Sequence, residues 1–503
     1  MPENQVPQSV LQSNLSAIRS IADAVRGTFG PQGMDVMLID QYGDFTITND
    51  GVKVLSLIET SHPAAKLVIE AAKTQEELVG DGTTTVTLLV DALLSEATQQ
   101  IEKGVPIPKL IDGIKQALGV ALTELNRQTK PLEGLDDPRL GALASIAGRR
   151  EDELVVLVME AAKSIGLEKL RANEFKFAHK ILAKSKAQNQ LLRGIVVNKR
   201  PLNPTMPREL EQVKVLVIDD ELAPQELPKE AIGTSEGFQE FQLSQQEFLG
   251  GLRKLAELDI KLVLVNGSIH PYAEEIFVQE GILAFQRVIS SEIHQASSYS
   301  QAKPASRRIL NLPKDEIVHH LGSLSKAIYR TDLELLSLEG ETQSTLVIGA
   351  ATEEAALEKE RIASDIASAI QAALRGGVVS GGGALELGLI PSLEKLKLEL
   401  NDSQSLTSFG IDCLIESLKK PLTQISSNLG FNALEKLSQV IAAQSAQGDL
   451  SLGIDADTGT IASMDKLGIY DAALVKSQAL KTACEVAIQI LKVNLVIRSR
   501  QID

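Results

Sequence analysis

Apolar residues recur at intervals of three and four close to the start of the chain. This spacing places them on one side of a helix and predicts an amphipathic α-helix. The positions that share this side are Leu11, Leu15, Ile18, Ala22 and Val25. Gly27 follows the last of them, and Pro31 lacks the backbone N–H that a continuing helix needs, so we expect the helix to end there.

The next segments change from a strand pattern to a helical pattern. DVMLID and DFTITND are typical of the two arms of a hairpin that turns through Tyr42 and Gly43. Residues 63 to about 104 are expected to form two helices, interrupted only by the turn GDGTTT. The helical pattern continues to about Arg150.

Short apolar runs alternate with helical stretches between about residues 190 and 350. The runs are GIVVNK, VKVLVIDD, IKLVLVNG, GILAFQRV and STLVIGA. Such alternation is typical of a separate α/β domain. Inside it, residues 221–250 are mostly polar but contain Phe238, Phe241 and Phe248. A long helix is expected after this domain, and it breaks at GGVVSGGG.

The composition limits the classes of function. With 503 residues the chain is long enough for about three domains. Lys plus Arg number 50 and Asp plus Glu 66, a net charge of −16, so we expect no nucleic-acid partner. Two cysteines far apart in sequence indicate neither a disulfide framework nor a cysteine metal site. Without a leader-like segment or a long uncharged apolar stretch, we expect a cytoplasmic protein that does not cross a membrane.

The stretch GDGTTT, residues 80–85, combines small residues with side-chain oxygens at a predicted helix start. Such a start has free N–H groups and a partial positive charge, which together bind anions. Glycines let a phosphate approach the backbone, the three threonines offer hydroxyl donors, and Asp81 can hold Mg²⁺, which prefers oxygen ligands. The alternative interpretation is a simple helix cap, in which Asp81 or a threonine satisfies the helix end.

Other glycine turns are weaker signals when each is taken alone. TFGPQG and TNDG are common in ordinary loops and turns. Three consecutive glycines in GGVVSGGG disfavour a helix and indicate that something lies against the main chain. Asp365 stands in a charged helical stretch, where an acid usually faces solvent. The sequence contains no P-loop, kinase or HExxH motif, and no GxGxxG follows VKVLVIDD.

Together and in this order, these stretches resemble a chaperonin subunit, more closely the group II type or the related bacterial group III type. The resemblance rests on IADAVRGTFGPQG, DFTITNDG, QEELVGDGTTT, SDIASAI, GGVVSGGGALE and GIYDAALVK, among others, and it extends over nearly the whole chain. It implies a multidomain α+β protein with the chaperonin fold. Such a fold has a mainly helical equatorial domain, a small intermediate domain and an α/β apical domain with a helical protrusion.

The resemblance also implies where the domains lie. The equatorial domain would combine residues 1–131 and 385–503, and the intermediate domain residues 132–190 and 350–384. The apical domain would cover residues 191–349, with the protrusion near 221–250. Glycine turns near both ends of the chain can contact one nucleotide only if the chain between them leaves the nucleotide-binding domain and returns to it. This agrees with an equatorial domain made from both ends.

The resemblance implies a site for ATP and Mg²⁺ at named positions. Asp81 matches the acid that holds the metal, Asp50 an acid beside the γ-phosphate, and Asp365 the acid that positions the attacking water. The positions that match nucleotide contacts are Thr28, Gly30, Pro31, Gly51, Gly82, Thr83, Thr84, Thr85, Gly381, Gly382 and Asp471. Phosphoryl transfer depends on placement and charge neutralisation, so the three acids suffice for hydrolysis.

Some positions depart from the family pattern. Gln32 stands where the family usually has lysine, and Asn494 with Leu495 replaces an expected pair of aspartates. Neither change removes the three acids, so we expect an active ATPase. Arg149 is a loose counterpart of a basic residue that group II members place near the γ-phosphate.

The resemblance implies an ATP-driven chaperone that encloses unfolded polypeptides. Self-association would form a double ring with eight or nine subunits per ring, and a built-in lid would make a separate lid protein unnecessary. Phe238, Phe241 and Phe248 lie in the segment expected to form the lid, although packing against a local helix is an equal alternative. The candidates for client contact are Tyr272, Ile276 and Phe277.

Two other functions remain open at this point. A chaperonin-like scaffold could form rings without ATP turnover, although the presence of the three acids argues against it. A small-molecule ATPase or kinase could use an unusual phosphate site, although no cluster for a second substrate is visible.

Overall fold

The computed structural model describes residues 10–39, 43, 45–149, 151–224, 235–340, 344–400 and 406–493. The chain divides into two compact units. The first comprises Met1–Met159, Leu167–Ala178 and Ile362–Asp503, and it therefore combines both ends of the chain. The second comprises Glu160–Gly166 and His179–Arg361. The chain passes from one unit to the other four times: within α7 (Asp152–Ile165), after Gly166, after Ala178 and within α14 (Glu353–Gly376).

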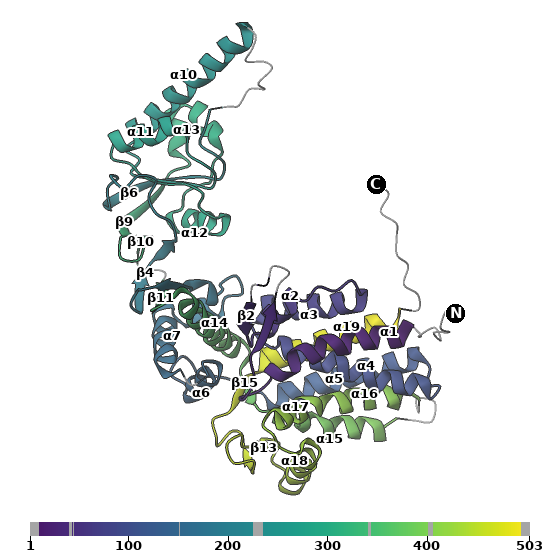
Figure 1. The fold of residues 1–503 in the computed structure, drawn as a ribbon. Helices are drawn as coiled ribbons and strands as arrows, with labels where there is room; N and C mark the ends of the chain where they lie inside the picture. The colour runs from purple at the N-terminus through teal and green to yellow at the C-terminus, as the bar shows by residue number, and fades with distance from the viewer. Residues whose placement is uncertain are drawn as a thin grey trace. The chain divides into compact units, whose positions relative to one another are not determined.

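The first unit is built around the helix α4 (Thr83–Glu102). Helices from both ends of the chain pack against it (Figure 1): α1 (Val10–Val25), α3 (Pro63–Val79), α16 (Ser408–Leu418) and α19 (Ala473–Leu491). The other helices of this unit are η1 (Arg26–Thr28), α2 (Gly51–Leu57), α5 (Ile107–Gln128), α6 (Pro138–Ala147), α8 (Leu167–Arg171), α15 (Ala384–Leu398), α17 (Lys420–Asn428) and α18 (Ala433–Gln447). Consecutive residues of α4, among them Leu88, Leu89 and Val90, are buried, as expected for a helix surrounded by others.

Short antiparallel pairs of strands complete the first unit. The pairs are β1 (Val36–Ile39) with β2 (Phe45–Thr48), β12 (Val378–Ser380) with β15 (Tyr470–Ala472), and β13 (Leu452–Ile454) with β14 (Ile461–Ser463). The pair β12–β15 joins the GGVVSGGG segment to the GIYDAALVK segment. Two motifs that are distant in sequence therefore share one sheet.

The second unit contains a six-stranded and a three-stranded sheet. The six-stranded sheet has the order β5 (Ile195–Val197), β10 (Leu335–Glu339), β9 (Gly322–Arg330), β6 (Glu209–Ile218), β7 (Leu262–Val265) and β8 (Leu283–Phe285). The smaller sheet has the order β3 (Ile181–Ser185), β11 (Ser344–Ala350) and β4 (Gln190–Arg193). The second unit also contains the helices α10 (Ser235–Glu257), α11 (Pro271–Gln279), α12 (Ser290–Ser300) and α13 (Lys314–Val318). β6, β7 and β8 run parallel, and their continuous apolar runs are buried.

Most of the elements expected from the sequence are confirmed. The first helix, the hairpin, the two helices that flank GDGTTT and the long helix before GGVVSGGG are all present. STLVIGA forms β11, but this strand belongs to the smaller sheet. The finer division into equatorial, intermediate and apical domains stays a prediction. No helix in the described ranges is long and apolar enough to span a membrane.

Candidate functional site

Carboxylates from distant segments of the first unit act on the ionisation of Glu76. This residue lies in the last turn of α3. Burial raises the pKa of Glu76, and the negative charges of three aspartates raise it further, from 4.5 to about 8. The three are Asp81, Asp365 and Asp50, in order of their effect. The three acids that the sequence singled out are therefore near enough for their charges to act on one side chain, and their roles at a nucleotide stay a prediction.

Asp50 is held at the start of α2. Its Oδ1 accepts a hydrogen bond of 2.8 Å from the N–H of Val52, so the carboxylate is the N-cap of this helix. The next residue, Gly51, is buried, and a Cβ atom there would lie 2.5 Å from Thr84 Oγ1 and 3.0 Å from Thr83 Oγ1. Because a residue without a side chain stands at position 51, the TNDG turn packs directly on the threonines of GDGTTT.

The start of α4 is not closed by a side-chain cap. Its N-cap residue is Gly82, which adopts a φ of +91° and has no side chain to offer. Asp81 accepts a hydrogen bond from the N–H of Gly82, one residue before the helix. Thr83 and Thr85 are buried, and Thr84 is half-buried. A simple cap, with Asp81 or a threonine as the capping residue, does not describe this turn.

The Asp81 carboxylate lies among other charges. The surrounding protein displaces water and raises the pKa of Asp81, the N–H of Gly82 lowers it, and the charge of Asp471 raises it again. Lys476 lowers this pKa and Asp50 raises it, both by less. The residue as a whole remains exposed at the surface of the unit. A cation beside this carboxylate would stabilise its ionised form.

The second glycine-rich segment lies beside Asp471. Val379 pairs with Asp471 across β12 and β15, and the N–H of Gly381 donates to the carbonyl of Ile469 at 2.9 Å. A Cβ atom at Gly381 would lie 3.3 Å from the Asp471 carboxyl group. Gly382 adopts a φ of +64°, a region that favours glycine. The structure therefore places both glycines at the strand that carries Asp471.

A buried ammonium group holds Asp471 in place. The Nζ atom of Lys476 lies 2.9 Å from Asp471 Oδ2 and 2.9 Å from Glu386 Oε1. Burial alone lowers the pKa of Lys476, but the charges of both carboxylates outweigh it and raise this pKa. The sequence prediction names neither Lys476 nor Glu386 as a site residue, although they end the stretches GIYDAALVK and GGVVSGGGALE. The stretches were a signal for both residues, but the linear pattern does not indicate that the two side chains meet.

The TFGPQG turn is fastened to another part of the unit. Asn428 of α17 donates its Nδ2 to the carbonyl of Phe29 at 2.7 Å. Thr28 belongs to η1, which packs against α4. Gly30 adopts a φ of +93°, and both Gly30 and Pro31 are exposed. The contact of these three residues with a phosphate stays a prediction.

The positions that depart from the family pattern are exposed or lie outside the described residues. Gln32 is exposed in the TFGPQG turn. Arg149 is also exposed and adopts a φ of +52°. Asn494 and Leu495 lie outside the described residues.

The structure corrects two expectations in the second unit. Phe277 is fully buried, because α11 directs this side chain into the core beside the six-stranded sheet. It is therefore not available for client contact. Phe248 is 5% exposed, and its ring lies 5.8 Å from that of His270, so it packs the core and not an exposed lid.

The roles of the other apolar candidates of this unit stay predictions. Tyr272 is 43% exposed, and Ile276 is half-buried on the same helix. Phe238 and Phe241 belong to α10, and their side chains lie outside the described part of the structure.

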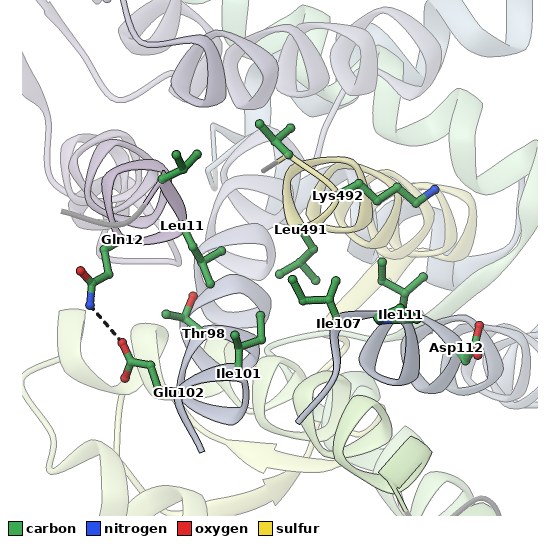
Figure 2. Close-up of a pocket in the computed structure, with 13 residues that line it drawn as sticks. Leu11, Gln12, Thr98, Ile101, Glu102, Ile107, Ile111, Asp112, Leu491 and Lys492 are labelled. Carbon is green, nitrogen blue, oxygen red and sulfur yellow. Dashed lines mark hydrogen bonds between the residues drawn. The ribbon is translucent and has the colours of Figure 1, made fainter. Parts of the chain in front are cut away.

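A cavity of about 800 Å³ lies elsewhere in the first unit, between the ends of α1, α4, α5 and α19. Figure 2 shows its mostly apolar lining, with Leu11, Ile101 and Ile107 on different helices, and a hydrogen bond of 3.2 Å from Gln12 to Glu102. None of the acids or glycines named above lines it. The cavity is therefore separate from the candidate nucleotide site.

Comparisons with known proteins agree with the fold and with these motifs. The model of the TCP-1/cpn60 chaperonin family matches residues 21–501. A thermosome subunit of Pyrococcus abyssi is 30% identical over 517 residues, covering 100% of this chain and 93% of that protein. A thermosome subunit alpha of Aeropyrum pernix is 30% identical, covering 97% and 91% respectively.

A solved structure, described as a group III chaperonin in the open state, is similar along almost the whole chain. Its TM-score is 0.84 at 38% identity, and the match covers 97% of this chain and 98% of that one. The expected fold class, a multidomain α+β protein with the chaperonin fold, is therefore confirmed. This chain belongs to the TCP-1/cpn60 chaperonin family.

Proposed function

We propose that the first unit binds Mg-ATP and that Asp50, Asp81 and Asp365 act together on its phosphates. As a member of this family, the protein is an ATP-hydrolysing chaperone for the folding of other proteins. Two observations support the proposed site: the TNDG turn packs on Thr83 and Thr84, and the charges of all three acids act on Glu76. Family membership also argues against the two alternatives, a scaffold without turnover and a small-molecule ATPase or kinase.

A magnesium ion fits these residues. Mg²⁺ is usually bound by one or two carboxylates together with substrate phosphates and water, and not by a closed cage of side chains. In the described ranges, no group of three histidine, cysteine or acidic side chains is placed to hold a metal ion. Phosphate oxygens would therefore complete the shell around an ion held by Asp81. When bound, the ion would neutralise charge on the phosphates.

The remaining groups would position the triphosphate and the attacking water. Free N–H groups at the start of α4 would donate to phosphate oxygens, together with the hydroxyls of the three threonines. Asp50 would lie beside the γ-phosphate, and Asp365 would accept a hydrogen bond from the attacking water. The other proposed nucleotide contacts are Thr28, Gly30, Pro31, Gly51, Gly381, Gly382 and Asp471.

Chaperonins of this family form ring oligomers and bind unfolded clients. For this chain, a double ring of eight or nine subunits per ring with a built-in lid is the finer proposal. The hairpin β1–β2 supports subunit contacts, because Met37, Ile39, Phe45 and Ile47 are all exposed apolar side chains on it. Tyr272 is the proposed client contact that retains an exposed ring.

A cytoplasmic location is part of the proposal. Cys413 and Cys484 are both free and buried, and burial raises the pKa of each thiol to about 12. Thiols without disulfide partners fit a reducing compartment.

Replacement of Asp365 tests the proposed site. The variant Asp365→Ala should bind ATP in the presence of Mg²⁺ but fail to hydrolyse it, because the carboxylate acts on the water and not on the nucleotide. Equilibrium binding of labelled ATP and release of phosphate measure the two steps separately. Asp412→Asn is a matched control, since Asp412 pairs with Lys397 at 2.6 Å in the same unit and should leave turnover unchanged. Normal turnover in Asp365→Ala would remove the assignment.

A further inference from the structure

Gln75 links the GDGTTT turn to a distant segment of the first unit. Its side chain is fully buried on α3. The Nε2 atom donates to the carbonyl of Asp81 at 2.9 Å and to the carbonyl of Val475 at 3.2 Å. Val475 lies at the start of α19, next to Lys476, which holds Asp471. One amide group therefore joins the turn that carries Asp81, the proposed metal ligand, to the segment beside Asp471, a proposed nucleotide contact.

The orientation of this amide follows from its partners. Both are main-chain carbonyl oxygens, which only accept hydrogen bonds, so the nitrogen must face them. The Oε1 atom of Gln75 is buried and has no hydrogen-bond partner in the described structure. An apolar side chain of similar size would avoid this unsatisfied acceptor, but it would leave the carbonyls of Asp81 and Val475 without this donor. Its two donated bonds are what it contributes.

The packing around this amide leaves the turn little freedom. A Cβ atom at Gly82 would lie 2.8 Å from Gln75 Nε2 and 2.9 Å from Val475 Cγ1. Gly82 is the N-cap of α4 and adopts a φ of +91°. The distance between the helix start and α19 is therefore set by direct contact with Gln75 and Val475, and the carbonyl of Asp81 is fixed by the same amide.

We infer that Gln75 is a positioning residue for ATP hydrolysis, which fixes the Asp81–Gly82 turn against Val475 so that Asp81 meets the metal ion in one orientation. The inference rests on the proposed function, because it takes Asp81 as the metal ligand. Gln75 would contact neither the nucleotide nor the ion. Its effect should therefore be on how much Mg²⁺ the enzyme requires.

The variant Gln75→Met removes the donor and keeps a side chain of similar length. The Mg²⁺ concentration that gives half-maximal ATP hydrolysis should rise about tenfold, the effect of losing about one net hydrogen bond from the turn. Gln128→Met is the matched control, because Gln128 also donates its amide to a distant carbonyl of this unit, that of Gly388 at 3.1 Å. The control should keep the wild-type Mg²⁺ requirement. The same wild-type requirement in Gln75→Met would overturn the inference.

A second variant and a second measurement keep the test valid if Gln75→Met does not fold. Gln75→Asn keeps the amide group but is shorter by one methylene, so it cannot donate to both carbonyls. The readout is the Mg²⁺ concentration that gives half-maximal equilibrium binding of labelled ADP, which does not depend on turnover. This concentration should rise in Gln75→Asn as it does in Gln75→Met. A wild-type Mg²⁺ requirement for ADP binding would also overturn the inference.

Asp81→Asn, measured in parallel, separates this inference from the proposed site. Loss of Mg²⁺-dependent hydrolysis in Asp81→Asn, together with a wild-type Mg²⁺ requirement in Gln75→Met, would refute only the role of Gln75. Unchanged hydrolysis in Asp81→Asn would refute the metal assignment, and the role of Gln75 with it. The supporting result is a severe loss in Asp81→Asn and an increased Mg²⁺ requirement in Gln75→Met.

Discussion

Replacement of Glu76 by glutamine should make the nucleotide-free protein more stable, and increasingly so at higher pH. The pKa of Glu76 is raised from 4.5 to about 8, so the folded chain holds this proton more tightly than the unfolded chain does. The stabilisation that comes from the proton is therefore complete below about pH 4.5 and is lost as pH rises through about 8. Glutamine keeps the shape of the protonated acid and does not titrate.

The size of the effect follows from the shift. One pKa unit corresponds to about 1.4 kcal/mol, so between about pH 6 and pH 9 the wild type should lose about 2 to 3 kcal/mol relative to Glu76→Gln. Calorimetric unfolding of both nucleotide-free proteins at the two pH values measures this difference. Glu77→Gln is the matched control, because Glu77 is the neighbouring residue and is exposed. A stability difference that does not change with pH would refute the clustering of acids around Glu76.

Three further results are expected. Gly51→Ala places a methyl group against the GDGTTT threonines, so kcat/KM for ATP should fall about tenfold, or about 1.4 kcal/mol, in steady-state assays. Gly119→Ala is the control, because a Cβ atom at this position of α5 would meet nothing within 4 Å, and it should leave kcat/KM for ATP unchanged. Lys476→Met leaves the buried carboxylate of Glu386 and the half-buried one of Asp471 without their partner, and it should cost about 3 to 5 kcal/mol in urea unfolding. A loss below about 1 kcal/mol would contradict a buried ion pair between Lys476 and Glu386. Phe277→Ala should cost about 3 to 5 kcal/mol of stability, whereas Tyr272→Ala should leave stability almost unchanged and weaken suppression of client aggregation. The reverse result would contradict the assignment of core and surface.

Periodicity and turn chemistry predicted the elements that organise the first unit. The apolar spacing from Leu11 to Val25 corresponds to α1, and the glycines of GDGTTT correspond to the break between α3 and α4. Strand β9 is missing from the prediction because its sequence, GSLSKAIYR, has neither a continuous apolar run nor a sustained alternation of apolar and polar residues. Such a strand is recognised from its partners in the sheet more than from its own sequence.

The candidate site was predictable only as far as its motifs. The sequence identified three acids: Asp50 and Asp81 beside glycine turns, and Asp365 in a segment with a family pattern. In the structure, the charges of all three act on Glu76. Gln75 and Lys476 act through contacts with segments far away in the sequence, and no local pattern indicates such contacts. The same limit explains why Phe277 was wrongly predicted as a client contact. The sequence alone did not show which side of α11 faces the sheet.

Distant segments of the first unit should bind one triphosphate together. A structure of the assembled protein with ADP, Mg²⁺ and aluminium fluoride, determined by electron cryomicroscopy, tests it most directly. The aluminium fluoride group should lie between the start of α4 and Asp365. The Mg²⁺ ion should contact Asp81, and the nucleoside of ADP should lie beside Gly381. Nucleotide density at any other place in the subunit would contradict the account.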